Sequence, residues 1–171
     1  MGELDTDLPP DEPGEVPAAP GSALGSLRER REKAVQELYT DRVVPRLPGP
    51  VFVRYKPVPQ RRIEAANKQA AASKDKDRDV ISNAAVLAEA CLGVFEVIDG
   101  VEVSVDDRDR DGEWPKFDSR LAEVLGVKWT KAGDVVRSLY LTDGDVISAV
   151  REVVRWSGFV DEQLERDDEG N

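Results

Sequence analysis

Apolar residues recur at helical spacing in six segments of the chain and alternate with polar residues in two others. The helical spacing predicts helices over about 23–42, 60–73, 79–92, 117–125, 131–140 and 143–156. The 79–92 segment has almost no polar face, so we expect its helix to be the most buried. Short runs of β-branched and aromatic residues predict strands over 51–56, 94–98 and 101–105.

An Asp-Gly pair, Asp99-Gly100, separates the second and third predicted strands. Such a pair between two alternating runs is the strongest short-range signal for a β-hairpin. We therefore expect an α+β fold, in which a small antiparallel sheet of about three strands is covered by four to six helices. Prolines over 43–50 predict a stiff linker after the first helix, and their Pro-x-x-Pro spacing leaves peptide recognition as a less favoured alternative.

Capping residues mark several of these helix ends. Thr130 is the expected N-cap of the 131–140 helix, and Thr142 with Asp145 three residues later forms a capping-box pattern. Gly126 and Gly158 follow the ends of the 117–125 and 143–156 helices, where glycine is favoured as a stop.

The net charge of -11 is concentrated at the two ends of the chain. Residues 1–21 carry six acidic residues and no basic one, and residues 161–171 carry six acidic residues and one Arg. The sequence predicts a disordered, acidic, Pro-rich tail over 1–21, one α+β domain with an N-terminal helix over 22–160, and an acidic tail over 161–171. Solubility is the simplest role for such tails, with partner docking as the alternative.

The composition excludes several classes of function. The chain of 171 residues has no His and one Cys, so it has no Ser-His-Asp or Cys-His machinery, no Cys/His zinc site and no intramolecular disulfide. No glycine-rich phosphate loop, basic nucleic-acid footprint or membrane span is present. We predict a cytoplasmic protein that is not an enzyme, with no catalytic, cofactor-binding or metal-binding residue. Cys91 is expected to be a core thiol, since no base is present to activate it.

One loop matches the spacing of a calcium-binding EF-hand. Asp107, Asp109 and Asp111 fall at its first, third and fifth positions, Gly112 at the sixth and Asp118 at the twelfth. The segment before the loop is a predicted strand instead of a helix, and Asp118 is also placed to cap the following helix. A solvated acidic turn, partly neutralised by Arg108 and Arg110, is therefore the preferred interpretation, and we predict no structural calcium site.

A series of short motifs resembles the tail assembly chaperones of long-tailed bacteriophages, closest to those of phages with actinobacterial hosts. The motifs run across residues 50–157: Arg54-Tyr55-Lys56-Pro57, Ala90-Cys91-Leu92-Gly93, the Asp-Gly turn, Phe117-Asp118-x-Arg120-Leu121-Ala122-x-x-Leu125-Gly126, Asp134-Val135-Val136-Arg137, and Glu152-Val153-Val154 with Trp156. Arg outnumbers Lys by 16 to 8, which suits a GC-rich genome.

The resemblance implies a non-catalytic protein of the host cytoplasm. Such chaperones bind the phage tape measure protein, keep it soluble, help tail tube subunits gather along it, and are absent from the finished particle. Many are made in two lengths by a ribosomal frameshift. The basic helix face at Arg28–Lys33, the outward residues of the 51–56 strand and the edge of that strand are candidate contact surfaces, and self-association is a further option.

Two other functions remain open on the sequence. A small virion structural protein, such as a head-to-tail connector or tail terminator, shares the size and the expected phage origin. A calcium-responsive binding module built on residues 107–118 belongs to another class and is the less favoured alternative.

Overall fold

The computed structural model describes residues 22–108 and 112–159 of the chain. The predicted disordered tails, 1–21 and 161–171, lie outside these residues. The chain divides into two compact units, residues 1–37 and 38–171. In the first unit, helix α1 (Ser22–Gln36) exposes the side chains of Leu27 and Val35.

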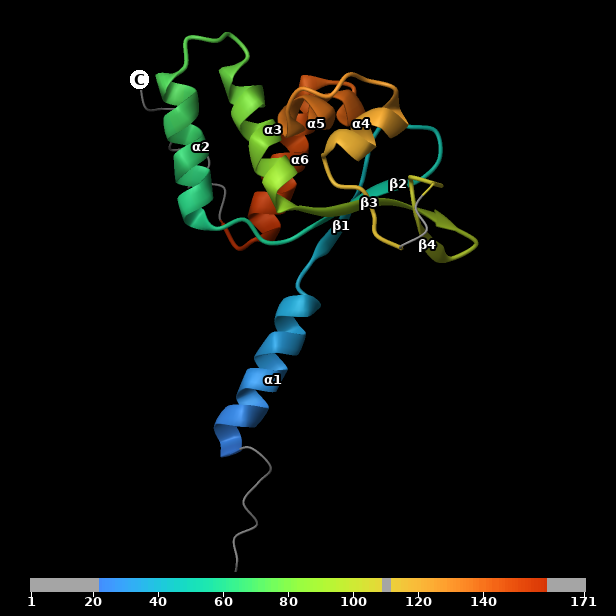
Figure 1. Cartoon of the computed structure of the whole chain (residues 1–171). Helices are drawn as coiled ribbons and strands as arrows, with labels where there is room; N and C mark the ends of the chain where they lie inside the picture. Colours follow the sequence, from blue (N-terminus) through green and yellow to red (C-terminus); the bar gives the residue numbers. More distant parts are fainter. Residues whose placement is uncertain (1–21, 109–111, 160–171) are drawn as a thin grey trace, which may run out of the picture. The chain divides into compact units, whose positions relative to one another are not determined.

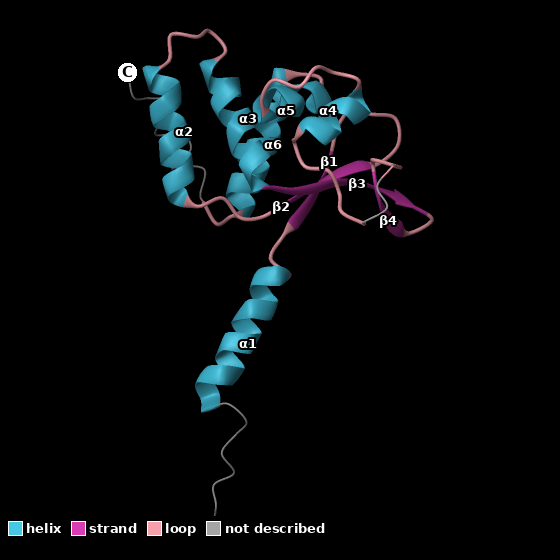
Figure 2. Ribbon diagram, in the orientation of Figure 1, coloured by secondary structure: helices cyan, strands magenta, loops and turns pink. Residues whose placement is uncertain are grey.

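A four-stranded antiparallel sheet forms the base of the second unit (Figures 1 and 2). Its strands are β1 (Thr40–Val43), β2 (Val51–Tyr55), β3 (Cys91–Ile98) and β4 (Val101–Ser104), and their spatial order follows the sequence. The predicted hairpin is confirmed, because Ile98 pairs with Val101 and both Asp99 and Gly100 have the positive φ that this tight turn requires.

Strand β1 corrects the prediction of a helix over 23–42. The helix ends at Gln36, and residues 40–43 pair with residues 52–55 of β2. Pairing with β2 across the loop of residues 44–50 decides this conformation, whereas the helical spacing is a local signal. The sheet therefore has four strands where the sequence predicted about three.

Five helices lie on one side of the sheet (Figure 2), with α2 packed against α3 on its outer side. They are α2 (Gln60–Ala72), α3 (Arg78–Ala90), α4 (Ser119–Leu125), α5 (Ala132–Tyr140) and α6 (Asp143–Trp156). Helix α3 is central, since it contacts α2, α5 and α6 and buries six of its side chains. With α1, the described residues hold six helices, and the predicted α+β class is confirmed. None of the described helices is long and apolar enough to cross a membrane.

Helix α3 ends two residues before the predicted boundary at residue 92. Cys91 already pairs with Tyr55 as the first residue of β3, and the Lys56 amide donates to the Ala90 carbonyl over 2.9 Å. Leu92, which was placed on the buried stripe of the helix, is 38% exposed. Helical spacing alone did not reveal that the helix passes into a strand without a turn.

Three of the predicted caps and the predicted stop at Gly158 after α6 are confirmed, and one cap is wrong. The Asp118 carboxylate accepts the Leu121 amide at the start of α4, Thr142 accepts the Asp145 amide at the start of α6, and Gly126 ends α4 with φ 68°. Lys131, however, is the N-cap of α5. The Thr130 hydroxyl instead donates to the Asp134 carboxylate on the first turn of that helix.

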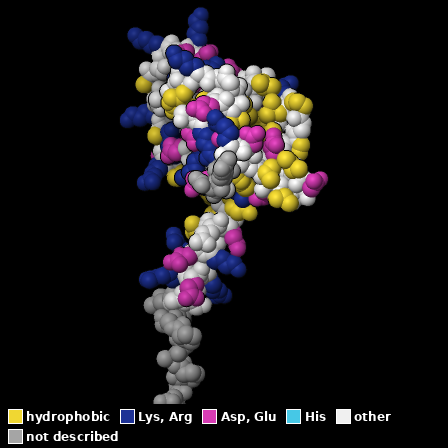
Figure 3. Space-filling view, turned by 45° about the vertical axis from the view of Figure 1, so that its right-hand side comes forward, with side chains coloured by type: hydrophobic (Ala, Val, Ile, Leu, Met, Phe, Trp, Pro, Cys, Tyr) yellow, Lys and Arg dark blue, Asp and Glu magenta, His cyan; other side chains and the backbone are white. Residues whose placement is uncertain are grey.

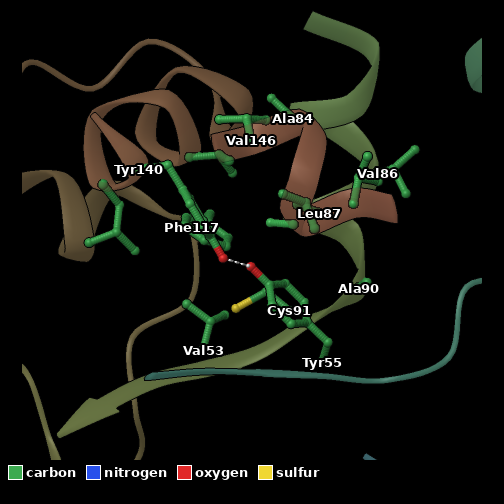
Figure 4. Close-up of a cluster of buried hydrophobic side chains, with 14 of the residues drawn as sticks. Val53, Tyr55, Ala84, Val86, Leu87, Ala90, Cys91, Phe117, Tyr140 and Val146 are labelled. Atoms are coloured by element: carbon green, nitrogen blue, oxygen red, sulfur yellow. Dashed lines mark hydrogen bonds between the residues drawn. The ribbon is translucent and has the colours of Figure 1, made fainter. Parts of the chain in front are cut away.

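Between the sheet and the helices lies an apolar core, and two tyrosine hydroxyl groups meet inside it (Figure 4). The hydroxyl groups of Tyr55 and Tyr140 lie 2.7 Å apart and are hydrogen-bonded to each other, with Cys91 beside them. Each hydroxyl satisfies the other, so neither leaves a buried polar group unpaired.

Burial raises the pKa of Cys91 to about 12 and that of Tyr140 to about 12, and it also raises the pKa of Tyr55. These groups bind their protons more tightly when folded, so their contribution to stability is complete below pH 9 and is lost as the pH rises toward 12. We predict that the free energy of unfolding, measured in urea, falls above pH 9, with each group contributing up to about 1.4 kcal/mol per pH unit.

Cys91→Ala should make this fall shallower between pH 9 and 10. In the unfolded chain the Cys91 thiol loses its proton at a lower pH than the tyrosine phenols do, so it is the first of these groups to affect stability. An identical pH dependence in the wild type and Cys91→Ala would contradict the prediction.

Candidate functional site

Arg54 is the centre of the sheet face that the helices do not cover. Its guanidinium donates two hydrogen bonds to Asp41 on β1, at 2.8 and 2.9 Å, and one to Glu102 on β4, at 2.8 Å. The hydrogen bonds with Asp41 hold the pKa of Arg54 above its ordinary value. One side chain of β2 thus connects both edge strands across β3.

Aromatic rings enclose the same guanidinium. Its carbon lies 3.9 Å from the centre of the Tyr39 ring, 4.9 Å from that of Trp114 and 5.1 Å from that of Phe95. Trp114 stacks on Phe95 at 4.3 Å, and Phe95 on Phe52 at 5.5 Å. We call Tyr39, Asp41, Phe52, Arg54, Phe95, Glu102 and Trp114 the Arg54 cluster. Cation–π contacts of this kind strengthen when the cation is partly desolvated, and the Arg54 side chain is only 15% exposed.

Gly93 makes room for Trp114 over the sheet. A Cβ atom at position 93 would lie 2.8 Å from the Trp114 Cβ and 3.0 Å from its Cε3, closer than carbon atoms normally approach. The next residue, Val94, donates its amide to the Pro115 carbonyl over 2.8 Å. The segment around Trp114 therefore covers the first half of β3, beyond the point where β4 ends.

A second polar cluster lies directly after β4 and joins residues 106–108 to α4. The Asp106 carboxylate is buried and receives hydrogen bonds from Arg108, at 3.0 and 3.3 Å, and from Arg120, at 2.8 Å. Hydrogen bonds from these guanidinium groups, Arg108 first, hold the pKa of Asp106 well below its usual range. Arg108 also reaches Glu123 on α4. The cluster joins residues 106–108 to α4.

The predicted calcium loop is only partly described. Asp107 is exposed in a turn, Asp118 caps α4, and Asp109 and Asp111 lie outside the described residues. Arg108, expected to neutralise the acidic turn, pairs instead with Asp106 and Glu123. Within the described ranges, no group of three or more Cys, Asp or Glu side chains is placed to hold a metal ion.

Other candidates from the sequence fall in separate places. Cys91 is buried in the core, as predicted. Strand β2 is paired on both sides, so the expectation that its edge accepts an added strand is wrong. The basic residues at Arg28–Lys33 belong to α1, in the first unit. Trp114, which the sequence did not single out, stacks on Phe95.

The tip of the β3–β4 hairpin exposes a pair of apolar side chains. Ile98 is 53% exposed and its cross-strand partner Val101 is 60% exposed, and β4 is an edge strand of the sheet. Figure 3 shows hydrophobic side chains gathered on the side of the unit where this hairpin and α4 lie in Figure 1. Exposed apolar side chains beside a free strand edge are features that protein partners use.

A comparison of this chain with protein-family models, curated proteins and solved structures finds no match.

The contact between Gly93 and Trp114 gives a direct test of the Arg54 cluster. Gly93→Ala should lower the free energy of unfolding by about 1–3 kcal/mol, because the new methyl group displaces Trp114. Chemical denaturation measures the change. The matched control is Gly144→Ala on α6, where an added Cβ meets nothing within 4 Å, and this variant should be neutral or stabilised by up to about 1 kcal/mol. Equal stabilities of the two variants would show that Trp114 is not held over Gly93.

Proposed function

We propose that this protein is a phage tail assembly chaperone that acts without catalysis. In this role it binds the tape measure protein in the host cytoplasm, keeps it soluble and helps to recruit tail tube subunits. The resemblance across residues 50–157 supports the proposal, and this whole range lies within the second unit.

Many residues that carry the resemblance have structural roles in this fold. Arg54 is the centre of the Arg54 cluster, Tyr55 and Cys91 lie in the core, and Gly93 lies beneath Trp114. Arg120 binds Asp106, and Asp118 caps α4. Their roles favour a shared fold as the basis of the resemblance, because each residue fixes a backbone or packing position and none forms a reactive group.

The observation that carries the proposal is the exposed pair Ile98 and Val101 at the hairpin tip. Several charged groups in the second unit are already engaged within the fold, as the pairs of Arg54, Asp106 and Arg137 illustrate. The exposed apolar side chains have no such internal partner. A long helical client with apolar stripes aggregates unless they are covered, and covering them is favourable for both proteins.

Affinity for the client should therefore depend on the hairpin tip. We predict that replacing Ile98 and Val101 together by Thr weakens binding to the tape measure protein about tenfold, a loss of about 1.4 kcal/mol. The β-branched shape is kept, so the free energy of unfolding should change little. Quantitative pull-down of the co-expressed client, compared between the variant and the wild type at several dilutions, measures the effect.

Val43→Thr is the matched control, because Val43 is 57% exposed on the opposite edge strand, β1. If Val43→Thr weakens binding as much as the hairpin variant does, the hairpin is not the contact surface.

Co-expression tests the function itself. The tape measure protein should be insoluble alone and soluble with this chain, the two should co-purify, and purified particles should lack the chaperone. A client equally soluble without this chain contradicts the proposal. Stoichiometric presence of this chain in particles would instead favour a virion structural protein.

A further inference from the structure

The outer edge of β4 is open to another strand. Strand β4 pairs with β3 on one side and is the last strand of the sheet (Figure 2). The hairpin turn has two residues, so Ile98 and Val101 beside it form a hydrogen-bonded pair, and such pairs alternate along the ladder with pairs that lack hydrogen bonds. The N–H and C=O groups of Glu102 and Ser104 therefore point away from β3, toward the open edge.

Little in the described part of the chain protects this edge. No backbone group of the described residues bonds to the outward N–H and C=O groups of Glu102 and Ser104. Strand β4 contains neither Lys nor Pro, which commonly keep a strand edge from pairing. Its one charged residue, Glu102, is bonded to Arg54 over the sheet at 2.8 Å. The opposite edge strand, β1, carries two adjacent charged residues, so β4 is the edge better suited to pairing.

A second copy of β4 complements this edge in one register. When two antiparallel β4 strands are centred on Val103, each Val103 lies opposite the other, and each Glu102 lies opposite Ser104 of the second copy. All of the outward N–H and C=O groups of β4 are then paired. The two neighbouring registers that pair these groups place Glu102 opposite Glu102 or opposite Asp106 of the second copy. Like charges directly opposite each other destabilise a ladder, so the register centred on Val103 is favoured.

We propose that β4 pairs with β4 of a second copy of this chain, antiparallel and centred on Val103, so that two four-stranded sheets become one continuous sheet. The contact uses the same surface in both copies, and it is therefore complete with two of them. Weak complexes bury less than about 1,200 Å². Two strands of four residues make a contact of this class, so we expect the dimer to form at protein concentrations of about 0.1 mM and above.

Pairing of β4 also brings the two hairpins together. Ile98 follows the core residue Val94 by four positions, so it lies on the helix side of the sheet with its cross-strand partner Val101. Val103, two residues after Val101, lies on the same side. The hairpin side chains of the two copies therefore form one continuous apolar surface. The proposal is independent of the proposed chaperone function, because it depends only on a strand edge and its test needs no client.

Cross-linking through an introduced cysteine tests both the contact and its register. In Val103→Cys the two cysteines would form a pair without hydrogen bonds, with Cα atoms about 4.5 Å apart, which is within the range of a disulfide. The matched control is Ser104→Cys, since both positions are half-buried and its two cysteines would be more than about 8 Å apart. The only native cysteine, Cys91, is buried.

We expect Val103→Cys to form a disulfide-linked dimer when the full chain is mildly oxidised, and Ser104→Cys to remain largely monomeric on a non-reducing gel. Urea denaturation of the two reduced variants checks that both are folded. The proposal is overturned if folded Val103→Cys does not cross-link, or if the two variants cross-link to the same extent.

Sedimentation equilibrium of the full chain tests the contact without a cross-link. Ser104→Glu puts a carboxylate opposite Glu102 of the second copy, whereas Ser104→Lys puts an ammonium group there, and both lose the same hydrogen bond from the Asp106 amide. We expect Ser104→Glu to associate about tenfold more weakly than Ser104→Lys. Gln69→Glu and Gln69→Lys, the same two charges at an exposed position of α2, should associate alike. A wild-type chain that stays monomeric at about 1 mM, or equal association of the two Ser104 variants, contradicts the proposal.

Discussion

The fold of the second unit depends on how the sheet face opposite the helices is covered. Both edge strands have only four residues, and the helices bury one face of the sheet. Arg54 joins Asp41 on one edge to Glu102 on the other, while Trp114 packs over Gly93 and Phe95. Because of its bidentate pairing and its ring contacts, such an arginine stabilises the fold more than an ordinary surface ion pair does.

This arrangement also determines which surfaces remain for partners. The charges of the Arg54 cluster and of Asp106 are satisfied inside the fold, and the Cys91 thiol is buried. Apolar side chains at the hairpin tip and basic side chains around α2 are left exposed. The first of these surfaces suits an apolar partner.

Local signals in the sequence predicted most of the fold correctly. The Asp99-Gly100 turn and the caps at Asp118 and Thr142 each depend on residues within a few positions. Strand β1 and the α3–β3 boundary were missed because they depend on pairing with β2. The Arg54 cluster was missed for the same reason, since Arg54 and Trp114 are 60 residues apart. The available signal was Gly93, a glycine between the predicted 79–92 helix and the predicted 94–98 strand, since a glycine beside a strand can mark close approach by another group.

Hydrogen exchange in Arg54→Met tests most directly whether Arg54 holds the edges of the sheet. We expect the amides of β1 and β4 to exchange faster, while those of α3, α5 and α6 keep their protection. The control is Arg78→Met, which removes an exposed arginine with one ion pair at 3.9 Å and should change neither group. Unchanged protection of β1 and β4 in Arg54→Met would contradict the central role of Arg54.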